Sequence, residues 1–146
     1  MVKHFDHVTV VVRDIPQAKA FFSLLGFEED KAVVISGPMF ECYMGVSGIE
    51  AEHVTLVLAN ATRCEVQLLK YHHPDPIHDA AIERLDRLGF NHICFAVDDI
   101  EAEVATLRAH GIRTRNEIMD FHLRKLAFLA GPEGITVELS QWHQPD

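Results

Sequence analysis

Residues 6–15 read DHVTVVVRDI, and residues 91–100 read NHICFAVDDI. Each stretch places a histidine, His7 or His92, at the head of an apolar run that is typical of a strand. The two histidines coincide when the chain is shifted by 85 residues along itself. A buried strand rarely begins with a histidine, and here two predicted strands do.

The similarity between the two stretches continues beyond the strand. Asp14 and Asp99 stand before helical patterns and suit the N-cap position, where a side-chain oxygen accepts a hydrogen bond from a free backbone N–H. Gly26 and Gly111 each follow their histidine by 19 residues and suit the left-handed position after a helix. The sequence therefore predicts a repeated unit, with helices over 15–25 and 100–110.

Further strands are expected after each predicted helix. The turn at residues 131–134, GPEG, separates two apolar runs, and Pro74 and Pro76 break any strand between the copies. The predicted elements are strands over 5–12, 31–35, 41–44, 54–59, 65–69, 91–97, 113–118, 125–130 and 136–140, and a short helix over 79–88.

Each copy is thus a βαβββ unit, with one further edge strand expected in the first, and the predicted fold class is α+β. We expect one domain over residues 1–146, built from a first module at 1–72, a linker with a short helix at 73–89 and a second module at 90–146. Two such modules side by side would form a curved mixed sheet. The helices would cover its convex face, and its concave face would form a cleft.

The composition restricts the partners of this domain. A formal net charge of −9 over 146 residues disfavours nucleic acid and anionic membrane surfaces, but it leaves open a small molecule as substrate. The three cysteines form no CxxC pair, which favours reduced thiols in a cytoplasmic protein. We find no apolar run of membrane-spanning length and no signal-peptide pattern at the N-terminus.

Strand alternation places the two histidines on the face that turns away from the helices. Val8 and Val10 would pack against the helix, so His7 and Thr9 share the opposite face, and His92 lies on the matching face of the second copy. A single histidine at the head of a strand is usually an edge residue. Two histidines at equivalent positions of a repeat favour a shared function.

The last strand of each copy carries polar residues on the same face. In CEVQLL these are Glu65 and Gln67, and in ITVELS they are Thr136, Glu138 and Ser140. Burying an unpaired neutral polar group costs roughly 2–7 kcal/mol, and burying a charge costs far more. Glu138 therefore requires a compensating charge if it is as buried as the pattern indicates.

A divalent cation would compensate this carboxylate. His7, Gln67, His92 and Glu138 together offer two imidazoles, one amide oxygen and one carboxylate. Such a mixed nitrogen and oxygen set suits Ni, Co, Mn, Fe(II) or Zn, with positions left for water or substrate.

These residues also carry a resemblance to a known family. Through DHVTVVVRDI, VQLLKY, NHICFAVDDI and GPEGITVELSQW, the chain resembles the vicinal oxygen chelate superfamily over nearly its whole length. That superfamily includes glyoxalase I, methylmalonyl-CoA epimerase, extradiol dioxygenases, and bleomycin or fosfomycin resistance proteins. The resemblance implies a glyoxalase-like fold and one divalent metal per chain, held at the positions of His7, Gln67, His92 and Glu138.

The resemblance also separates the branches of the superfamily. Gln67 stands where glyoxalase I usually has glutamate, which is closer to the epimerase pattern. Epimerases carry a further catalytic carboxylate on the preceding strand, but the matching position here is Thr55. Glu50 and Glu52 are nearby in sequence and are expected in a loop.

The activity implied is metal-assisted removal of a proton next to a carbonyl, by an isomerase or a lyase. Glu138 is the predicted catalytic base, with Glu65 as a second candidate because it shares a strand face with Gln67. Glu65 and Arg124 are also predicted to contact the substrate. Two alternatives stay open. His7, His92 and Glu138 also match the two-histidine, one-carboxylate pattern of Fe(II) dioxygenases, and some relatives bind drugs or metabolites without catalysis. A homodimer is expected, because open sheets leave edge strands unpaired.

Overall fold

The computed structural model describes residues 1–60 and 64–144. Residues 61–63 of the predicted first module and 145–146 of the predicted second module lie outside the described residues. The chain divides into two compact units, Met1–His78 and Asp79–Asp146, and each unit contains its own sheet.

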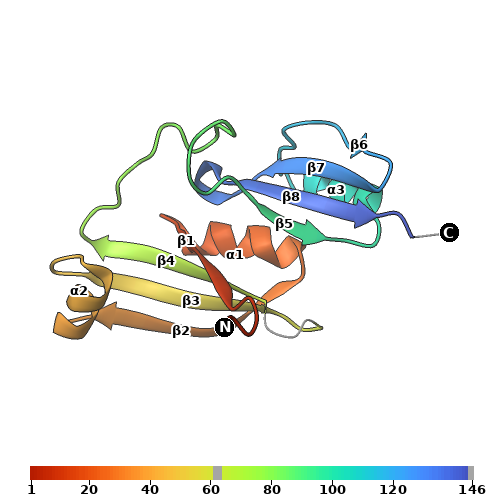
Figure 1. Ribbon diagram of the computed structural model, residues 1–146. Coiled ribbons are helices and arrows are strands. Elements are labelled where there is room, and N and C mark those ends of the chain that lie inside the picture. Colours follow the sequence, from red (N-terminus) through yellow and green to blue (C-terminus); the bar gives the residue numbers. More distant parts are fainter. Residues whose placement is uncertain (61–63, 145–146) are drawn as a thin grey trace. The chain divides into compact units, whose positions relative to one another are not determined.

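The first unit follows the predicted order, except that a helix replaces the strand predicted over 41–44 (Figure 1). Its elements are β1 (His7–Val11), α1 (Ile15–Leu24), β2 (Phe27–Ser36), α2 (Pro38–Met44), β3 (Glu50–Leu58) and β4 (Glu65–His73).

The second unit repeats this order without an equivalent of α2. Its elements are β5 (Ile93–Ala96), α3 (Ile100–Ala109), β6 (Met119–Asp120), β7 (Arg124–Ala130), a 3₁₀ turn at Pro132–Gly134 and β8 (Thr136–Trp142).

The two sheets share one topology. Their strand orders are β1-β4-β3-β2 and β5-β8-β7-β6, with the first pair of each parallel and the other pairs antiparallel. The register also repeats, since Thr9 pairs with Gln67 and Cys94 pairs with Glu138. The repeated unit and the α+β class predicted from the sequence are confirmed.

The predicted helix signals are also confirmed. The Asp14 carboxylate accepts a hydrogen bond from the backbone N–H of Gln17 at 2.9 Å, and Asp99 accepts one from Ala102 at 3.0 Å. Gly111 follows α3 with a φ of +82°, a left-handed conformation that favours glycine.

One helix covers one face of each sheet. In the first unit, α1 packs against β2 and β4 through Phe21 and Phe22, whose rings meet edge to face, and Phe22 also contacts Phe27. In the second unit, α3 packs against β7 and β8 through the buried residues Ile100, Val104 and Leu107. The opposite face of each sheet is the one that carries the predicted site residues.

Residues 41–44 form part of a helix, so the predicted strand there is wrong. Helix α2 begins at Pro38, directly after Gly37, and ends before Gly45, which is left-handed with a φ of +66°. A proline at the start and a glycine just past the end are typical of a helix, and this signal outweighs the strand-like pattern of ECYM. Phe40 packs onto a buried cluster of Ile35, Ile49, Ala51 and Leu69.

Residues 113–118 are not a strand. Only Thr114 forms an isolated bridge, to Leu129, and β6 begins after this segment. The backbone N–H of Phe128 donates instead to the side-chain oxygen of Asn116, at 2.8 Å. Backbone hydrogen bonds join Arg113 to Ala130 and Arg115 to Phe128, and beyond them the Asn116 side chain takes the place of further backbone pairing.

The predicted helix over 79–88 is also wrong, because this segment is a series of turns. Asp79 accepts a hydrogen bond from the N–H of Ala81 at 2.9 Å, which is the short-range contact of an Asx turn. The aspartate offers its own backbone an alternative to helical hydrogen bonding.

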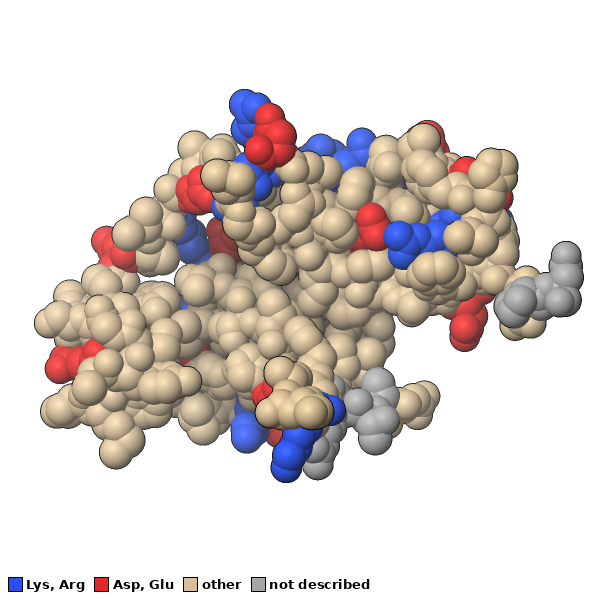
Figure 2. All heavy atoms as spheres, viewed as in Figure 1, with Lys and Arg blue, Asp and Glu red and all other residues tan. Residues whose placement is uncertain are grey.

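The surface has no single dominant charge on the face shown in Figure 2. Acidic and basic side chains are interspersed there, with neither sign forming a continuous patch. Within the described ranges 1–60 and 64–144, the helices are all too short or too polar to cross a membrane.

Candidate functional site

The second unit brings together two of the four predicted metal ligands. Nε2 of His92 lies 3.8 Å from Oε2 of Glu138. The parallel pairing of β5 with β8 produces this arrangement, because Cys94 lies opposite Glu138 and His92 precedes it on the same face. The ring of Phe128, opposite Glu138 on β7, meets the His92 ring edge to face at 5.3 Å.

The Glu138 carboxylate is buried, as the sequence predicted. Its residue is 7% exposed, and no Lys or Arg within the described part of the chain lies at ion-pair distance from it. The separation from His92 is too long for a hydrogen bond. It is shorter than twice a typical metal–ligand distance of about 2.1 Å, so the pair fits two ligands of one cation.

The first unit positions the other two predicted ligands on the corresponding face. His7 lies opposite Glu65, and Gln67 follows two residues later opposite Thr9. The Gln67 amide nitrogen donates to Glu65 at 3.3 Å, and its oxygen lies 3.4 Å from the Thr9 hydroxyl. Glu65 and Gln67 therefore share a face, as predicted.

His53 is a residue that the sequence analysis missed. Its Nε2 lies 3.0 Å from Oε1 of Gln67, and its side chain is part-buried. The alternation in HVTLVL places His53 and Thr55 on one face of β3, and Thr55 lies directly opposite Gln67. This alternation is the feature of the sequence from which His53 could have been predicted on the site face.

The position opposite Gln67 carries no carboxylate. Thr55 is fully buried there, while Glu50 and Glu52 lie on β3 rather than in the predicted loop. Strand alternation places Glu52 on the opposite face from Thr55, where its carboxylate lies 3.8 Å from His72. Glu52 is therefore excluded as a base beside Gln67.

Buried polar side chains gather on the faces that carry the predicted ligands. The four buried polar residues among those described are Thr55, Thr136, Glu138 and Ser140. The hydroxyl oxygens of Thr55 and Thr136 have no hydrogen-bond partner within the described residues. Orphaned hydroxyls are costly in a core, and they are expected where a ligand or water supplies the missing partner.

No three His, Cys, Asp or Glu side chains within residues 1–60 and 64–144 come close enough together to hold a metal. The predicted ligands fall into two pairs, one in each unit, which we call the half-sites of the predicted metal site. His92 and Glu138 lie 3.8 Å apart in one, and His7 and Gln67 lie on one sheet face in the other.

Arg124 stands on the same face as Glu138, at the far end of the sheet. It lies opposite Trp142, and its guanidinium carbon is 4.7 Å from the centre of the Trp142 ring. Four residues of strand, about 13 Å, separate it from the position opposite Glu138. Lys125 points the other way and binds Glu101 at 2.5 Å.

Cys94 is exposed on this face. Burial of the sulfur raises the pKa of the Cys94 thiol, the Ser140 hydrogen bond lowers it, and the Glu138 carboxylate raises it again. The thiol is therefore a weak nucleophile at neutral pH.

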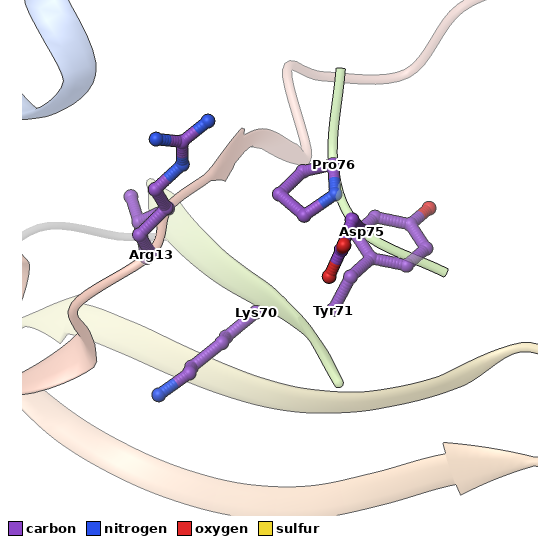
Figure 3. Close-up of a pocket in the computed structure, with 6 residues that line it drawn as sticks. Arg13, Lys70, Tyr71, Asp75 and Pro76 are labelled. Atoms are coloured by element: carbon purple, nitrogen blue, oxygen red, sulfur yellow. The ribbon is translucent and has the colours of Figure 1, made fainter. Parts of the chain in front are cut away.

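A separate cavity of about 390 Å³ lies in the first unit, where β1 and β4 end. Figure 3 shows that Arg13 and Lys70 extend in different directions, while Tyr71, Asp75 and Pro76 are grouped on another wall. The two cations do not converge on one point, as an anion site would require.

The comparisons with known proteins identify the family. A family model described as the Glyoxalase/Bleomycin resistance protein/Dioxygenase superfamily matches residues 6–128. The chain belongs to this superfamily. The resemblance to the vicinal oxygen chelate superfamily is thereby confirmed.

Two curated relatives of this superfamily protein cover almost all of it. An uncharacterized Escherichia coli protein, YaeR, is 24% identical over 140 residues, which is 94% of this chain and 95% of that protein. Human mitochondrial methylmalonyl-CoA epimerase is 28% identical over 142 residues, or 93% of this chain and 72% of the epimerase.

Solved structures confirm the glyoxalase-like fold. A glyoxalase family protein from Bacillus cereus has a TM-score of 0.90 at 23% identity, covering 99% of this chain and 97% of that one. A fosfomycin resistance protein from Listeria monocytogenes, complexed with Mn(II) and sulfate, has a TM-score of 0.62 at 14% identity, covering 98% of this chain and 95% of that one.

Proposed function

We propose that this protein is a divalent-metal-dependent isomerase or lyase that removes a proton next to a carbonyl group of a small substrate. The observation that carries the proposal is the buried Glu138 carboxylate, which faces His92 without a hydrogen bond and without a Lys or Arg partner in the described residues. A carboxylate in that setting requires a positive charge, and an imidazole beside it is a second metal ligand.

The metal ligands in this proposal are His7, Gln67, His92 and Glu138. Their equivalent positions in the two units support a shared role, because each unit supplies one imidazole and one oxygen donor at the same register. The similarity to an epimerase and to a fosfomycin resistance protein complexed with Mn(II) supports it further. The proposal holds whether the half-sites meet within one chain or between two copies.

The cation, when bound, would supply stabilisation of the negative charge that develops on the substrate oxygen. Glu138 would accept the proton, since it is the carboxylate on the site face of the second unit. Thr136 and Ser140 are buried on either side of it along β8, and the Thr136 hydroxyl is free to hydrogen-bond a ligand there. Arg124 and Glu65 would contact polar groups of the substrate.

Metal content tests the ligand set. Wild-type protein, purified without chelators, should contain one divalent ion per chain by elemental analysis. His92→Ala and Glu138→Ala should lose stoichiometric binding, whereas the control variants His110→Ala and Glu117→Ala, which alter exposed side chains elsewhere in the second unit, should keep it. Full metal content in both site variants would place the metal elsewhere.

Proton exchange tests the reaction. The metal-loaded protein is incubated in D₂O with a panel of small 2-oxo compounds and acyl thioesters, and NMR follows the hydrogen beside the carbonyl. Turnover or deuterium incorporation supports the proposal. Oxygen consumption with Fe(II) in place of exchange would instead identify a dioxygenase, and tight ligand binding without turnover would identify a binding protein.

A further inference from the structure

The residue before each site histidine contacts that histidine's ring. Nδ1 of His7 lies 2.5 Å from Oδ1 of Asp6, and Nδ1 of His92 lies 2.7 Å from Oδ1 of Asn91. Asp6 and Asn91 are equivalent under the 85-residue repeat, so the contact occurs twice at one position of the unit.

The direction of the second contact follows from the surroundings of Asn91. The Asn91 amide nitrogen donates to the backbone carbonyl of Leu85 at 2.6 Å. A carbonyl only accepts hydrogen bonds, so the nitrogen of the amide must face Leu85 and the oxygen must face His92. That oxygen also only accepts, which requires the proton of the His92 ring to be on Nδ1.

The direction of the first contact follows from charge. Asp6 is a carboxylate and accepts from His7 Nδ1, while its second oxygen lies 3.8 Å from Nε2 of His4. A carboxylate has no donor to offer when ionised, so the proton of the His7 ring is also on Nδ1.

We propose that Asp6 and Asn91 are positioning residues, which hold His7 and His92 as Nδ1–H tautomers and so present both Nε2 lone pairs to the metal. This inference rests on the proposed metal site for its consequence, but the tautomer itself is a property of the metal-free protein. Outer partners of this kind fix both the tautomer and the ring orientation of metal-binding histidines.

The surroundings of Asp6 and Asn91 account for the different residue types at these two equivalent positions. Asn91 lies against a carbonyl, so an aspartate there would place a negative charge beside the Leu85 oxygen and lose a donor. Asp6 lies beside His4 and is 72% exposed in its side chain, so a carboxylate is favourable there.

Nitrogen-15 NMR of metal-free protein with labelled histidine tests the tautomers directly, since protonated and lone-pair ring nitrogens have well-separated shifts. His7→Gln and His92→Gln identify the two ring signals. In wild-type protein both neutral rings should be Nδ1–H. Asp6→Ala and Asn91→Ala should each move their own histidine toward the Nε2–H form, while Asp6→Asn should keep the Nδ1–H form because an amide oxygen still accepts.

Metal affinity, measured by Co(II) titration, should fall about 10- to 100-fold in Asp6→Ala and Asn91→Ala. Asn91→Asp should keep the His92 tautomer but lower the melting temperature. Asp6 is exposed, so Asp6→Ala carries the test if Asn91→Ala does not fold.

The outcomes separate this inference from the proposed function. Unchanged tautomers in both alanine variants would overturn the inference and leave the metal site intact. A changed tautomer with unchanged Co(II) affinity would overturn the positioning role. Wild-type protein that binds no metal would overturn the proposed function, whatever the tautomers are.

Discussion

At the scale of single residues, the two halves of the candidate site differ in one functional group. Gln67 and Glu138 occupy the same register in their sheets, but only Glu138 carries a charge. An amide oxygen binds a cation and is too weak a base to remove a proton. Under the proposed function, this asymmetry would place the base in the second unit, and Thr55, opposite Gln67, offers no carboxylate in the first.

Replacing Glu138 by Gln should separate its two roles. The amide oxygen can still coordinate, so some metal is retained, but turnover should fall by roughly 10²–10⁴-fold, the usual contribution of a general base. Steady-state rates and metal content measured on the same samples check this. Glu117→Gln is the matched control, because it makes the same change at an exposed carboxylate that pairs with Arg108. Full activity in Glu138→Gln would exclude it as the base.

At the scale of elements, the turn that leads into β8 positions Glu138. Gly131 opens this turn, and a Cβ there would lie 2.8 Å from Cγ1 of Ile135 and 3.0 Å from Cγ2 of Val137. The first of these distances is closer than real Cβ contacts allow, and the backbone oxygen of Ile135 is only 3.1 Å away. Ile135 and Val137, at the start of β8, thus leave no room for a side chain at residue 131.

Gly131→Ala should therefore lower the free energy of unfolding by about 1–3 kcal/mol, the usual cost of overpacking a tight site. Chemical denaturation measures it. The penalty should be smaller in an Ile135→Ala background, which removes the nearest atom, and the double-mutant cycle gives the coupling between the two positions. Equal penalties in both backgrounds would show that steric contact with Ile135 is not the cause.

At the scale of the whole molecule, unpaired strand edges favour association. Within its own sheet, β2 pairs only with β3, and it exposes Val33 and Val34 at 49% and 66%. A long edge strand that carries exposed apolar residues is a ready surface for a second chain. We expect a homodimer on this basis.

Light scattering checks the homodimer. The mass should be close to twice the 16.5 kDa of one chain at micromolar concentration. Val34→Lys places a charge on the exposed edge and should weaken the dimer if β2 forms the contact, whereas a charge on exposed α3, in Ala109→Lys, serves as the control. A mass of 16.5 kDa for the wild-type protein would contradict the expectation.

The sequence by itself determined the features that short patterns of neighbouring residues encode. The N-caps Asp14 and Asp99 and the faces of the strands follow from spacing within a few residues, because alternation and capping act over short distances. The 85-residue repeat follows from the recurrence of these short patterns along the chain. The burial of Glu138 and its place on the face of Ser140 were predicted in the same way.

Only the tertiary structure decided which distant groups meet. The contact of His53 with Gln67 depends on the antiparallel register of β3 with β4, and the orientation of Asn91 depends on a carbonyl six residues away in an irregular segment. Helix α2 is stable because Phe40 packs onto residues from three strands, which no local pattern reports. Register, turn geometry and packing are long-range properties, so they appear only once the chain has folded.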